Sequence, residues 1–311
     1  MTAITASVVK DLRTKSGAGM MDCKKALTES GGDIEAAVDW LRKKGLAAAQ
    51  KKSARVAAEG VVAVQTSGNT GAMIELNAET DFVSRNETFQ TLARDMVALG
   101  LNLEGDEAAM RAAPLGSAAS LDEAVTQHIA SIGENLTFSR ASFLSVKSGV
   151  VASYVHSSLA SGLGRIGILI GMEWVDAEGD SAALAELGKR IAMHIVAAKP
   201  DYVHRDEISA EVADRERAIH AEQASASGKP ENVIEKMVDG KMRRFFSEIV
   251  LMEQTFVIDN ETIIADLVTS ESAKVGGAFR ITAFKRFVLG DHVEKVEQDF
   301  GAEVASMVSG K

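Results

Sequence analysis

A short sequence pattern occurs twice in this chain, in the same order, and it restricts the fold more than any other feature. The word at residues 60–63 (GVVA) returns 89 residues later at 149–152, and the word at 71–74 (GAMI) has a counterpart at 167–170 (GILI). Around each word the apolar residues have a period of two, and turn residues separate the runs, which is typical of β-hairpins. Because the turns are too short for crossover connections, each copy predicts antiparallel strands.

A helix is expected after each hairpin. Its apolar face consists of Phe89, Leu92, Met96 and Leu99 in the first copy and of Leu187, Ile191 and Ile195 in the second. This repeated order of elements predicts an α+β fold whose core is two related antiparallel-sheet subdomains with helices. We place the first subdomain at residues 59–140 and the second at 141–290, with 100–120 as an irregular segment around Pro114.

Three short helices are expected before the first hairpin, in an N-terminal domain of residues 1–45. The segment 16–19 (SGAG) separates the first helix from the second. Asp33 is placed as the N-cap of the third helix and Gly45 as its C-cap. Helices this short bury little apolar surface, so the predicted domain is small.

The charge of the chain is distributed unevenly. Residues 1–55 have a net charge of +5, although the chain as a whole carries −10. Opposite signs indicate two modules in different surroundings. The segment 42–55 carries six cations and no acidic residue, and we assign residues 46–58 to a basic linker. The alternative function of this segment is to bind the phosphates of RNA, although it has no aromatic residue for base stacking.

An insertion in the second subdomain lies between about residues 200 and 250. Apolar residues at heptad-like spacing occur on both sides of a turn that ends at Pro230. This spacing predicts an antiparallel coiled-coil hairpin. Strands are expected near residues 256–258 and 279–281, and a last helix, from about 292 to 307, is expected to form a C-terminal helical module of residues 291–311.

Composition places the chain among globular proteins. Of its 311 residues, 46% are apolar and 25% are charged, which excludes wholesale disorder. The single cysteine, Cys23, cannot form an internal disulfide or a thiolate metal site, which favours a reducing cytosol. No apolar run approaches the roughly 18 residues of a membrane span, and residues 1–10 do not have the pattern of a signal peptide. We therefore expect a soluble, cytoplasmic protein without membrane contact.

One motif of cofactor enzymes is present, but its context argues against that function. Residues 162–167 (GLGRIG) match G-x-G-x-x-G, yet residues typical of strands lie on both sides, whereas dinucleotide binding requires a helix after the motif. We interpret it as a hairpin loop and rank a dinucleotide enzyme as a distant third hypothesis. The chain has no P-loop motif, and its six histidines lack zinc-site spacing. We expect a binding protein, not an enzyme, without cofactor or metal, and a satisfied, half-buried His194.

The segment at residues 79–86 (ETDFVSRN) lies between a predicted strand and a predicted helix. An aromatic residue beside an acid at such a loop, here Phe82 beside Asp81, predicts an exposed apolar tip that carries a negative charge. In the alternative interpretation, Phe82 is a core anchor and Asp81 a helix cap.

Several sequence words, in order, resemble those of the translation elongation factor Ts family. They are residues 16–27 (SGAGMMDCKKAL), 32–37 (GDIEAA), 80–83 (TDFV), 132–135 (IGEN), 228–230 (GKP) and 236–242 (KMVDGKM). The words span nearly the whole chain. Residues 100–120 and 172–186 depart from the usual pattern of the family, and Ser84 stands where alanine is usual. These departures touch loops and leave the implied function intact.

The resemblance implies a guanine-nucleotide exchange factor that binds elongation factor Tu with GDP, disturbs its Mg²⁺ and phosphate site, and promotes GDP release so that GTP can rebind. It also implies a ubiquitin-associated (UBA)-like N-terminal domain and no direct binding of nucleotide by this chain. An RNA-binding translation factor that uses residues 42–55 is the alternative. A homodimer or a 2:2 complex with elongation factor Tu stays open, as does the partner of the coiled-coil hairpin.

The resemblance also implies which residues act. The residues that would dislocate the Mg²⁺ of the partner, with Phe82 as a wedge between partner side chains, are Thr80, Asp81, Phe82 and Val83. The residues of the N-terminal domain that would contact elongation factor Tu are Arg13, Gly19, Met20 and Met21. The C-terminal helix would contact the same nucleotide-binding domain of the partner. The alternative for Met20 and Met21 is that both belong to the core of the small domain.

Overall fold

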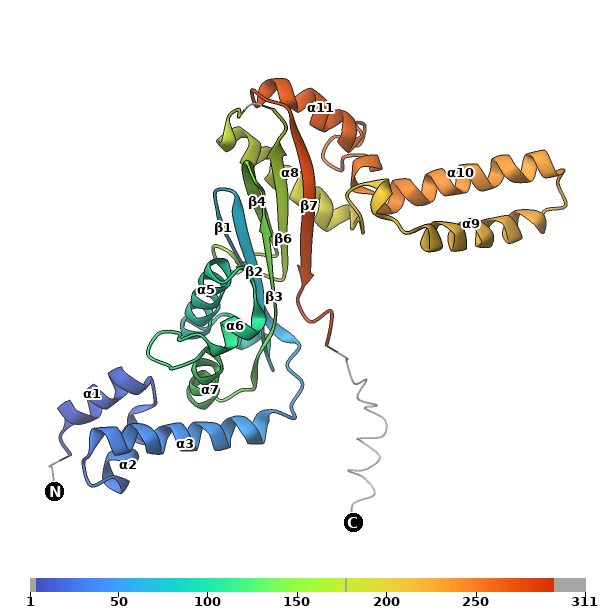
Figure 1. Cartoon of the computed structure of the whole chain (residues 1–311). Coiled ribbons are helices and arrows are strands. Elements are labelled where there is room, and N and C mark those ends of the chain that lie inside the picture. Colours follow the sequence, from blue (N-terminus) through green and yellow to red (C-terminus); the bar gives the residue numbers. More distant parts are fainter. Residues whose placement is uncertain (1–3, 177, 294–311) are drawn as a thin grey trace, which may run out of the picture.

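The computed structural model describes residues 4–176 and 178–293 and has an α+β fold (Figure 1). Its helices are α1 (Ala6–Ser16), α2 (Met20–Glu29), α3 (Ile34–Lys52), α4 (Asp81–Ser84), α5 (Glu87–Asn102), α6 (Glu107–Ala112), α7 (Leu121–Ile132), α8 (Ser181–Ala198), α9 (Ala210–Ser225), α10 (Glu231–Ile249) and α11 (Ile264–Lys274), with short 3-10 turns η1 (Arg205–Glu207) and η2 (Leu251–Glu253). Its strands are β1 (Glu59–Ser67), β2 (Thr70–Ala78), β3 (Leu136–Ser145), β4 (Gly149–His156), β5 (Leu163–Gly164), β6 (Ile166–Trp174) and β7 (Phe279–Val288).

The strands form two antiparallel sheets, as the repeat predicted. One has the order β3-β2-β1-β5 and the other β4-β6-β7. A helix covers the outer face of each sheet. Alternate residues of a strand point to opposite sides, so one set of side chains packs against this helix and the other set packs between the sheets. Val61 of β1 packs in the cluster that includes α5, whereas its neighbour Val62 packs between the sheets against Val151 and Leu169. The core is therefore layered as helix, sheet, sheet and helix.

The two copies of the repeat match residue by residue. Gly60 pairs with Asn77 and Gly149 with Glu173, and both glycines have φ +123°. A Cβ at either glycine would lie 2.2 or 2.1 Å from the carbonyl oxygen of the opposite strand. Because only glycine fits such a position, the repeated glycines mark the same backbone conformation in each copy.

A β-bulge also recurs at the same place. In the first sheet the register between β2 and β3 shifts between Glu75 and Leu76, and in the second the register between β6 and β7 shifts between Gly171 and Met172. β3 and β7 are thus equivalent third strands. The sequence did not reveal β3, and the predicted boundary between the subdomains, after residue 140, falls inside this strand.

The sheets approach each other most closely at two equivalent glycines. A Cβ at Gly71 would lie 2.7 Å from a methyl carbon of Val151, and a Cβ at Gly167 would lie 2.7 Å from a methyl carbon of Val62. Each glycine therefore makes room for the apolar side chains of the other copy. This close contact explains the glycine that begins each of the words GAMI and GILI.

The three-helix module consists of α1, α2 and the first half of α3. Leu12, Cys23 and Leu27 are fully buried at its centre, so the cysteine packs in the core as expected. The prediction that Gly45 ends the third helix was wrong, because α3 continues to Lys52. Gly45 faces α7, where a Cβ would lie 3.6 Å from that of Ala130. Much of the predicted linker is therefore the second half of a continuous helix.

Two further segments differ from the predictions. Residues 100–120 contain α6, which Asp106 caps by accepting hydrogen bonds from two backbone N–H groups. The strand expected at 256–258 does not form, because Phe256 closes a turn in which its N–H donates to the carbonyl oxygen of Thr262. Only β7 forms there, and the helix expected at about 292–307 lies outside the described residues.

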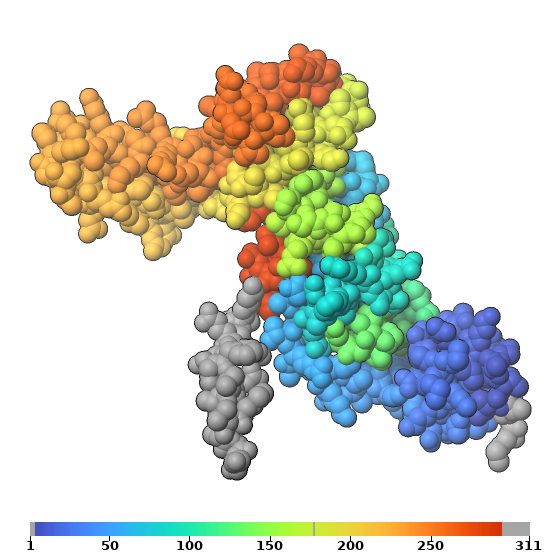
Figure 2. All heavy atoms as spheres, turned by 180° about the vertical axis from the view of Figure 1, so that it is seen from behind, coloured from blue at the N-terminus to red at the C-terminus, as the bar shows by residue number. Residues whose placement is uncertain are grey.

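The predicted helical hairpin consists of α9 and α10, which project from the second sheet (Figure 1). Ala224, Val238 and Met242 are buried between the two helices. Seen from behind, the hairpin and the three-helix module lie at opposite ends of the molecule (Figure 2). In residues 4–176 and 178–293, no helix is both long enough and apolar enough to cross a membrane.

Candidate functional site

The tip, defined as residues 80–83, begins directly after strand β2 and is mostly the one-turn helix α4. Phe82 is 78% exposed and Asp81 is also exposed, whereas Val83 is buried. Val83 thus anchors the turn in the core while its neighbours face outward. The alternative interpretation of Phe82 as a core anchor is wrong, and the residue at the N-cap position of α4 is Thr80 rather than Asp81.

A reciprocal pair of carboxylates holds the base of the tip. Glu134 accepts hydrogen bonds from the backbone N–H of Thr80 at 2.9 Å and from its hydroxyl at 2.7 Å. In return, Glu79 accepts the backbone N–H of Asn135 at 2.6 Å. Hydrogen bonds to charged acceptors are stronger than neutral ones, so the start of the tip is tied firmly to the end of α7.

The end of α3 joins the same cluster. The Arg55 guanidinium lies 3.3 Å from the Glu79 carboxylate, and the Arg55 carbonyl oxygen accepts a hydrogen bond from the Asn135 side chain at 2.8 Å. Three elements that are far apart in sequence therefore meet below the tip.

The C-terminal side of the tip is fixed by local hydrogen bonds. The Ser84 hydroxyl donates to the Asp81 carbonyl oxygen at 2.5 Å, and the Gln90 side chain donates to the Ser84 carbonyl oxygen at 2.9 Å. Asn86 caps α5 by accepting the N–H of Thr88. Ser84, the residue at which the sequence departs from the family pattern, thus stabilises the turn that presents Asp81.

The glycine-rich segment at residues 162–167 contributes a positive charge near the tip. It contains β5 and the start of β6, and the residues after it continue β6 instead of forming a helix, so it lies between strands as predicted. The Arg165 side chain donates to Glu59 at 2.7 Å. This bond and the charge of Glu59 raise the pKa of Arg165 above its usual value, and the charge of Asp81 adds to the effect.

The predicted contact residues of the three-helix module are all exposed on its surface. Arg13 and Gly19 are exposed, and Met20 and Met21 are 58% and 75% exposed. The alternative that the two methionines belong to the core is therefore wrong. Because α2 buries Cys23 and Leu27 on its other side, its first turn presents two apolar side chains to solvent.

A hollow lies between the three-helix module and the first subdomain. Its volume is about 470 Å³, and it is lined by Thr14 and Gly17 at the end of α1 and by Glu87 and Thr88 at the start of α5. None of the predicted contact residues of the tip or of the three-helix module lines it.

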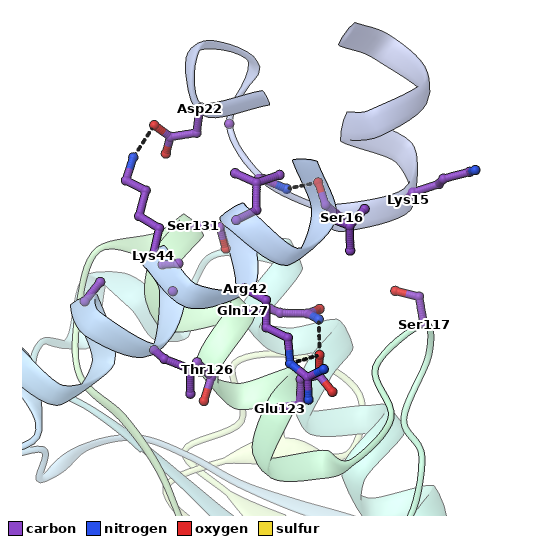
Figure 3. Close-up of a pocket in the computed structure, with 18 of the residues that line it drawn as sticks. Lys15, Ser16, Asp22, Arg42, Lys44, Ser117, Glu123, Thr126, Gln127 and Ser131 are labelled. Atoms are coloured by element: carbon purple, nitrogen blue, oxygen red, sulfur yellow. Dashed lines mark hydrogen bonds and ion pairs between the residues drawn. The ribbon is translucent and has the colours of Figure 1, made fainter. Parts of the chain in front are cut away.

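A second cavity, of about 380 Å³, separates the three-helix module from α7 (Figure 3). Ion pairs cross or border it: Arg42 lies 3.2 Å from Glu123, and Lys44 lies 2.5 Å from Asp22. Together with the pair of Arg55 and Glu79, these contacts give three cations of the basic segment 42–55 a carboxylate partner. Such pairing reduces the charge that the segment offers to an RNA phosphate.

Within 4–176 and 178–293, no group of three His, Cys, Asp or Glu side chains is arranged to hold a metal ion. His194 is fully buried, more than predicted, and it is satisfied by the Gln254 side chain at 2.9 Å and the Val257 N–H at 3.2 Å.

The tip was predicted from the sequence, but the residues that hold it were not. Glu134 and Asn135 were only part of a family word, and Glu79 had no role. The hydrogen bonds join Glu79 to Asn135 and Glu134 to Thr80. The partners are at least 54 positions apart, and a single sequence does not show that such distant residues meet.

Comparisons with known proteins agree with these observations. The family model described as "Elongation factor TS" matches residues 79–291. The chain is 51% identical over 310 residues to "Elongation factor Ts" of Rhodospirillum rubrum, which covers 99% of each chain, and 52% identical over 308 residues to that of Rhodospirillum centenum, again 99% of each. It is 48% identical over 311 residues to that of Parvibaculum lavamentivorans, which covers 100% of each.

Proposed function

Because this chain belongs to the elongation factor Ts family and is therefore a nucleotide exchange factor of elongation factor Tu in translation elongation, we propose that it acts on that GTPase through the tip. Asp81 and Phe82 enter beside the Mg²⁺ site of the partner, Phe82 as a wedge between partner side chains, while Thr80 and Val83 hold them in place. The observation that carries this proposal is the exposure of Phe82, 78%, on a turn whose two ends are fixed.

The metal is an effective target for such a factor. In GTPases, Mg²⁺ bridges the nucleotide phosphates to the protein, so disturbing it weakens nucleotide binding and switch-loop order together. Linkage then requires reciprocity: if the factor weakens nucleotide binding, nucleotide weakens binding of the factor by the same ratio. Fresh GTP therefore releases the factor, and no chemical bond is made or broken.

The tip does not supply enough energy alone. A thousandfold weakening of GDP binding corresponds to about 4 kcal/mol of coupling. Burial of one phenylalanine contributes roughly 1.5–3 kcal/mol. Other contacts must share the work, and we assign them to the surface of Arg13, Gly19, Met20 and Met21 and to the C-terminal module.

The finer features of the assembly belong to the same proposal. The three-helix module acts as a UBA-like domain, and α9 with α10 acts as a short antiparallel coiled coil that is available to the partner or to a second copy in a homodimer or 2:2 complex. The exchange takes place in the cytoplasm, as a step of translation. The RNA-binding alternative is not supported by the family comparison.

The test is stopped-flow release of fluorescent GDP from elongation factor Tu with Phe82→Ala. Because Phe82 is exposed, its truncation is expected to change the free energy of unfolding by less than about 0.5 kcal/mol, while catalysed GDP release falls at least tenfold. Ile258→Ala, which truncates a half-exposed apolar residue at a turn of the second subdomain, is the matched control and should exchange normally. Normal exchange by Phe82→Ala would refute the wedge.

A further inference from the structure

A buried carboxylate in the first sheet has no role in the proposal so far. Glu75 of β2 is fully buried. One of its oxygens lies 2.8 and 2.7 Å from two guanidinium nitrogens of Arg140 on β3. The other oxygen accepts the Asn77 side chain at 3.0 Å and the backbone N–H of Gly290 at 2.7 Å. Gly290 lies 215 residues further along the chain, just after β7.

Arg140 reaches the same place from the other side of the carboxylate. Its guanidinium donates to the carbonyl oxygen of Val288 at 3.0 Å and stacks 4.1 Å above the ring of Phe287. Glu75 and Arg140 of the first sheet therefore bind the end of β7 in the second sheet and the turn that follows it.

The turn that follows β7 also packs closely against both subdomains. Gly290 has φ +74°, and a Cβ there would lie 2.6 Å from the carbonyl oxygen of Ala58, immediately before β1. The N–H of Leu289 donates to the carbonyl oxygen of Arg165 at 2.9 Å. The direction in which the chain leaves the core toward residues 291–311 is thus set by contacts with both subdomains.

The internal repeat shows that the fold itself does not need this pair. At the equivalent bulge of the second sheet, the position of Glu75 is occupied by Gly171 and that of Arg140 by Ala283. The same bulge forms there without any charge. Since a fully buried carboxylate is costly to desolvate, the presence of Glu75 in one copy only calls for a local reason. The local difference is the neighbour: Glu75 and Arg140 lie against the end of β7, whereas Gly171 lies against Leu144 and Val146 near the end of β3.

Apolar packing already joins the two sheets. Val62, Met73, Val151 and Leu169 fill the space between them and are almost fully buried. Cohesion of the sheets is thus provided without Glu75. What the ion pair adds is direction, because hydrogen bonds to a backbone N–H and a backbone carbonyl fix orientation where apolar contacts do not.

We propose that Glu75 and Arg140 are positioning residues for nucleotide exchange: they fix the exit of β7 so that the C-terminal module meets elongation factor Tu at the same time as the tip. The tip follows strand β2 only a few residues after Glu75, so one strand sets the place of both contacts. This inference rests on the proposed function, in which the tip and the C-terminal module act on one partner.

The test uses the full-length chain with Glu75→Gln, which keeps the shape of the side chain and removes its charge. Glu173→Gln is the matched control, because Glu173 is a nearly buried carboxylate of the second sheet that pairs with Arg280 and does not touch the exit of β7. We expect Glu75→Gln to lower catalysed GDP release about tenfold, equivalent to 1.4 kcal/mol of coupling, and Glu173→Gln to leave it within twofold.

A distance measurement reports on positioning directly. Spin labels on Lys189→Cys, an exposed site of α8, and on Asp291→Cys, an exposed site just after β7, give a distance distribution for the exit of β7, while the fully buried Cys23 is protected from labelling. Glu75→Gln should broaden this distribution, and Glu173→Gln should not. Slower exchange with an unchanged distribution, or a wild-type distribution as broad as that of Glu75→Gln, would overturn the proposal.

A second variant covers the case in which Glu75→Gln does not fold. Gly290→Ala leaves the buried pair intact but places a Cβ against the carbonyl oxygen of Ala58 at φ +74°. It should slow exchange and broaden the distance distribution in the same way, and normal behaviour in both assays would refute the inference. A wild-type chain that exchanges and a Phe82→Ala that does not would still support the proposed function, so the two failures are distinguishable.

Discussion

Glu134 binds Thr80 at two atoms, with one carboxylate oxygen 2.9 Å from the backbone nitrogen and the other 2.7 Å from the hydroxyl. The two residues are 54 positions apart and belong to the ends of α7 and β2. Because the hydroxyl and the N–H of one residue are held together, the peptide before Asp81 has little freedom to rotate. The orientation of the exposed Phe82 therefore depends on a residue that is far from it in the chain.

Substituting Glu134 by alanine should impair exchange although no residue of the tip is changed. The variant loses both acceptors and leaves the Thr80 N–H unpaired, which costs about 1–3 kcal/mol of stability in that region. We expect GDP release to fall roughly tenfold, because a displaced tip no longer fits the partner. Stopped-flow GDP release checks this, with Asp95→Ala, an exposed acid on α5, as the control. Wild-type exchange by a folded Glu134→Ala would show that the tip orients without its support.

Substituting Asp81 by alanine should weaken exchange most when magnesium is limiting. A displaced Mg²⁺ returns from solution when the ion is abundant, so the contribution of the carboxylate shows fully only when it is scarce. Measurement of GDP release across a magnesium titration tests this, with Glu87→Gln at the start of α5 as the control. An effect that does not depend on magnesium would assign Asp81 a role in the turn alone.

Substituting Met20 and Met21 by glutamine should reduce the affinity for elongation factor Tu and leave the stability almost unchanged. Both side chains are exposed, so the free energy of unfolding should change by less than about 0.5 kcal/mol for each. Leu27→Ala, in the buried core of the same module, should instead cost about 2–5 kcal/mol. Calorimetric titration and thermal unfolding separate the two effects. Unchanged affinity would remove this corner from the interface.

The protein should lose stability in mild acid because of His194. Burial lowers the pKa of this histidine below its ordinary value, against the opposing hydrogen bond to Gln254. Between the two values the unfolded chain binds more protons than the folded one, so stability is fully present above the ordinary value of about 6.5 and falls as the pH decreases.

The slope that one such proton contributes is at most about 1.4 kcal/mol per pH unit. Urea unfolding of His194→Gln between pH 5 and 8 should show a weaker dependence on pH than the wild type, although the variant is less stable at pH 8. His156→Gln, which removes an exposed histidine, controls for the substitution. Parallel curves for wild type and His194→Gln would contradict the assignment.

The repeated sheets were predictable because period-two patterns and glycines at fixed places reflect local backbone geometry. Gly60 and Gly149 belong to this class, since their positive φ is recorded in the sequence as a glycine. The exposure of Phe82 was also predicted, from its place between a strand and a helix. Each of these features depends on neighbours in the chain.

The parts that could not be predicted depend on contacts between distant residues. Gly45 was expected to end a helix, but the packing of α3 on α7 carries the helix past it. The strand expected at 256–258 had suitable residues, but Phe256 bonds to Thr262 in a turn instead of joining a sheet. The contacts of Glu79, Glu134 and Glu75 join positions up to 215 residues apart, and nothing local in the sequence reports them.

The unbroken course of α3 from the three-helix module to the base of the tip has a consequence for the kinetics of association. A flexible tether would let the module search a large volume, and the partner would have to immobilise it at an entropic cost. A continuous helix of 19 residues, acting as a rod, instead holds the module in a fixed orientation relative to the base of the tip. Docking at one end of the rod is then expected to raise the effective concentration of the other end at the partner surface, so that the two encounters follow each other almost as one event.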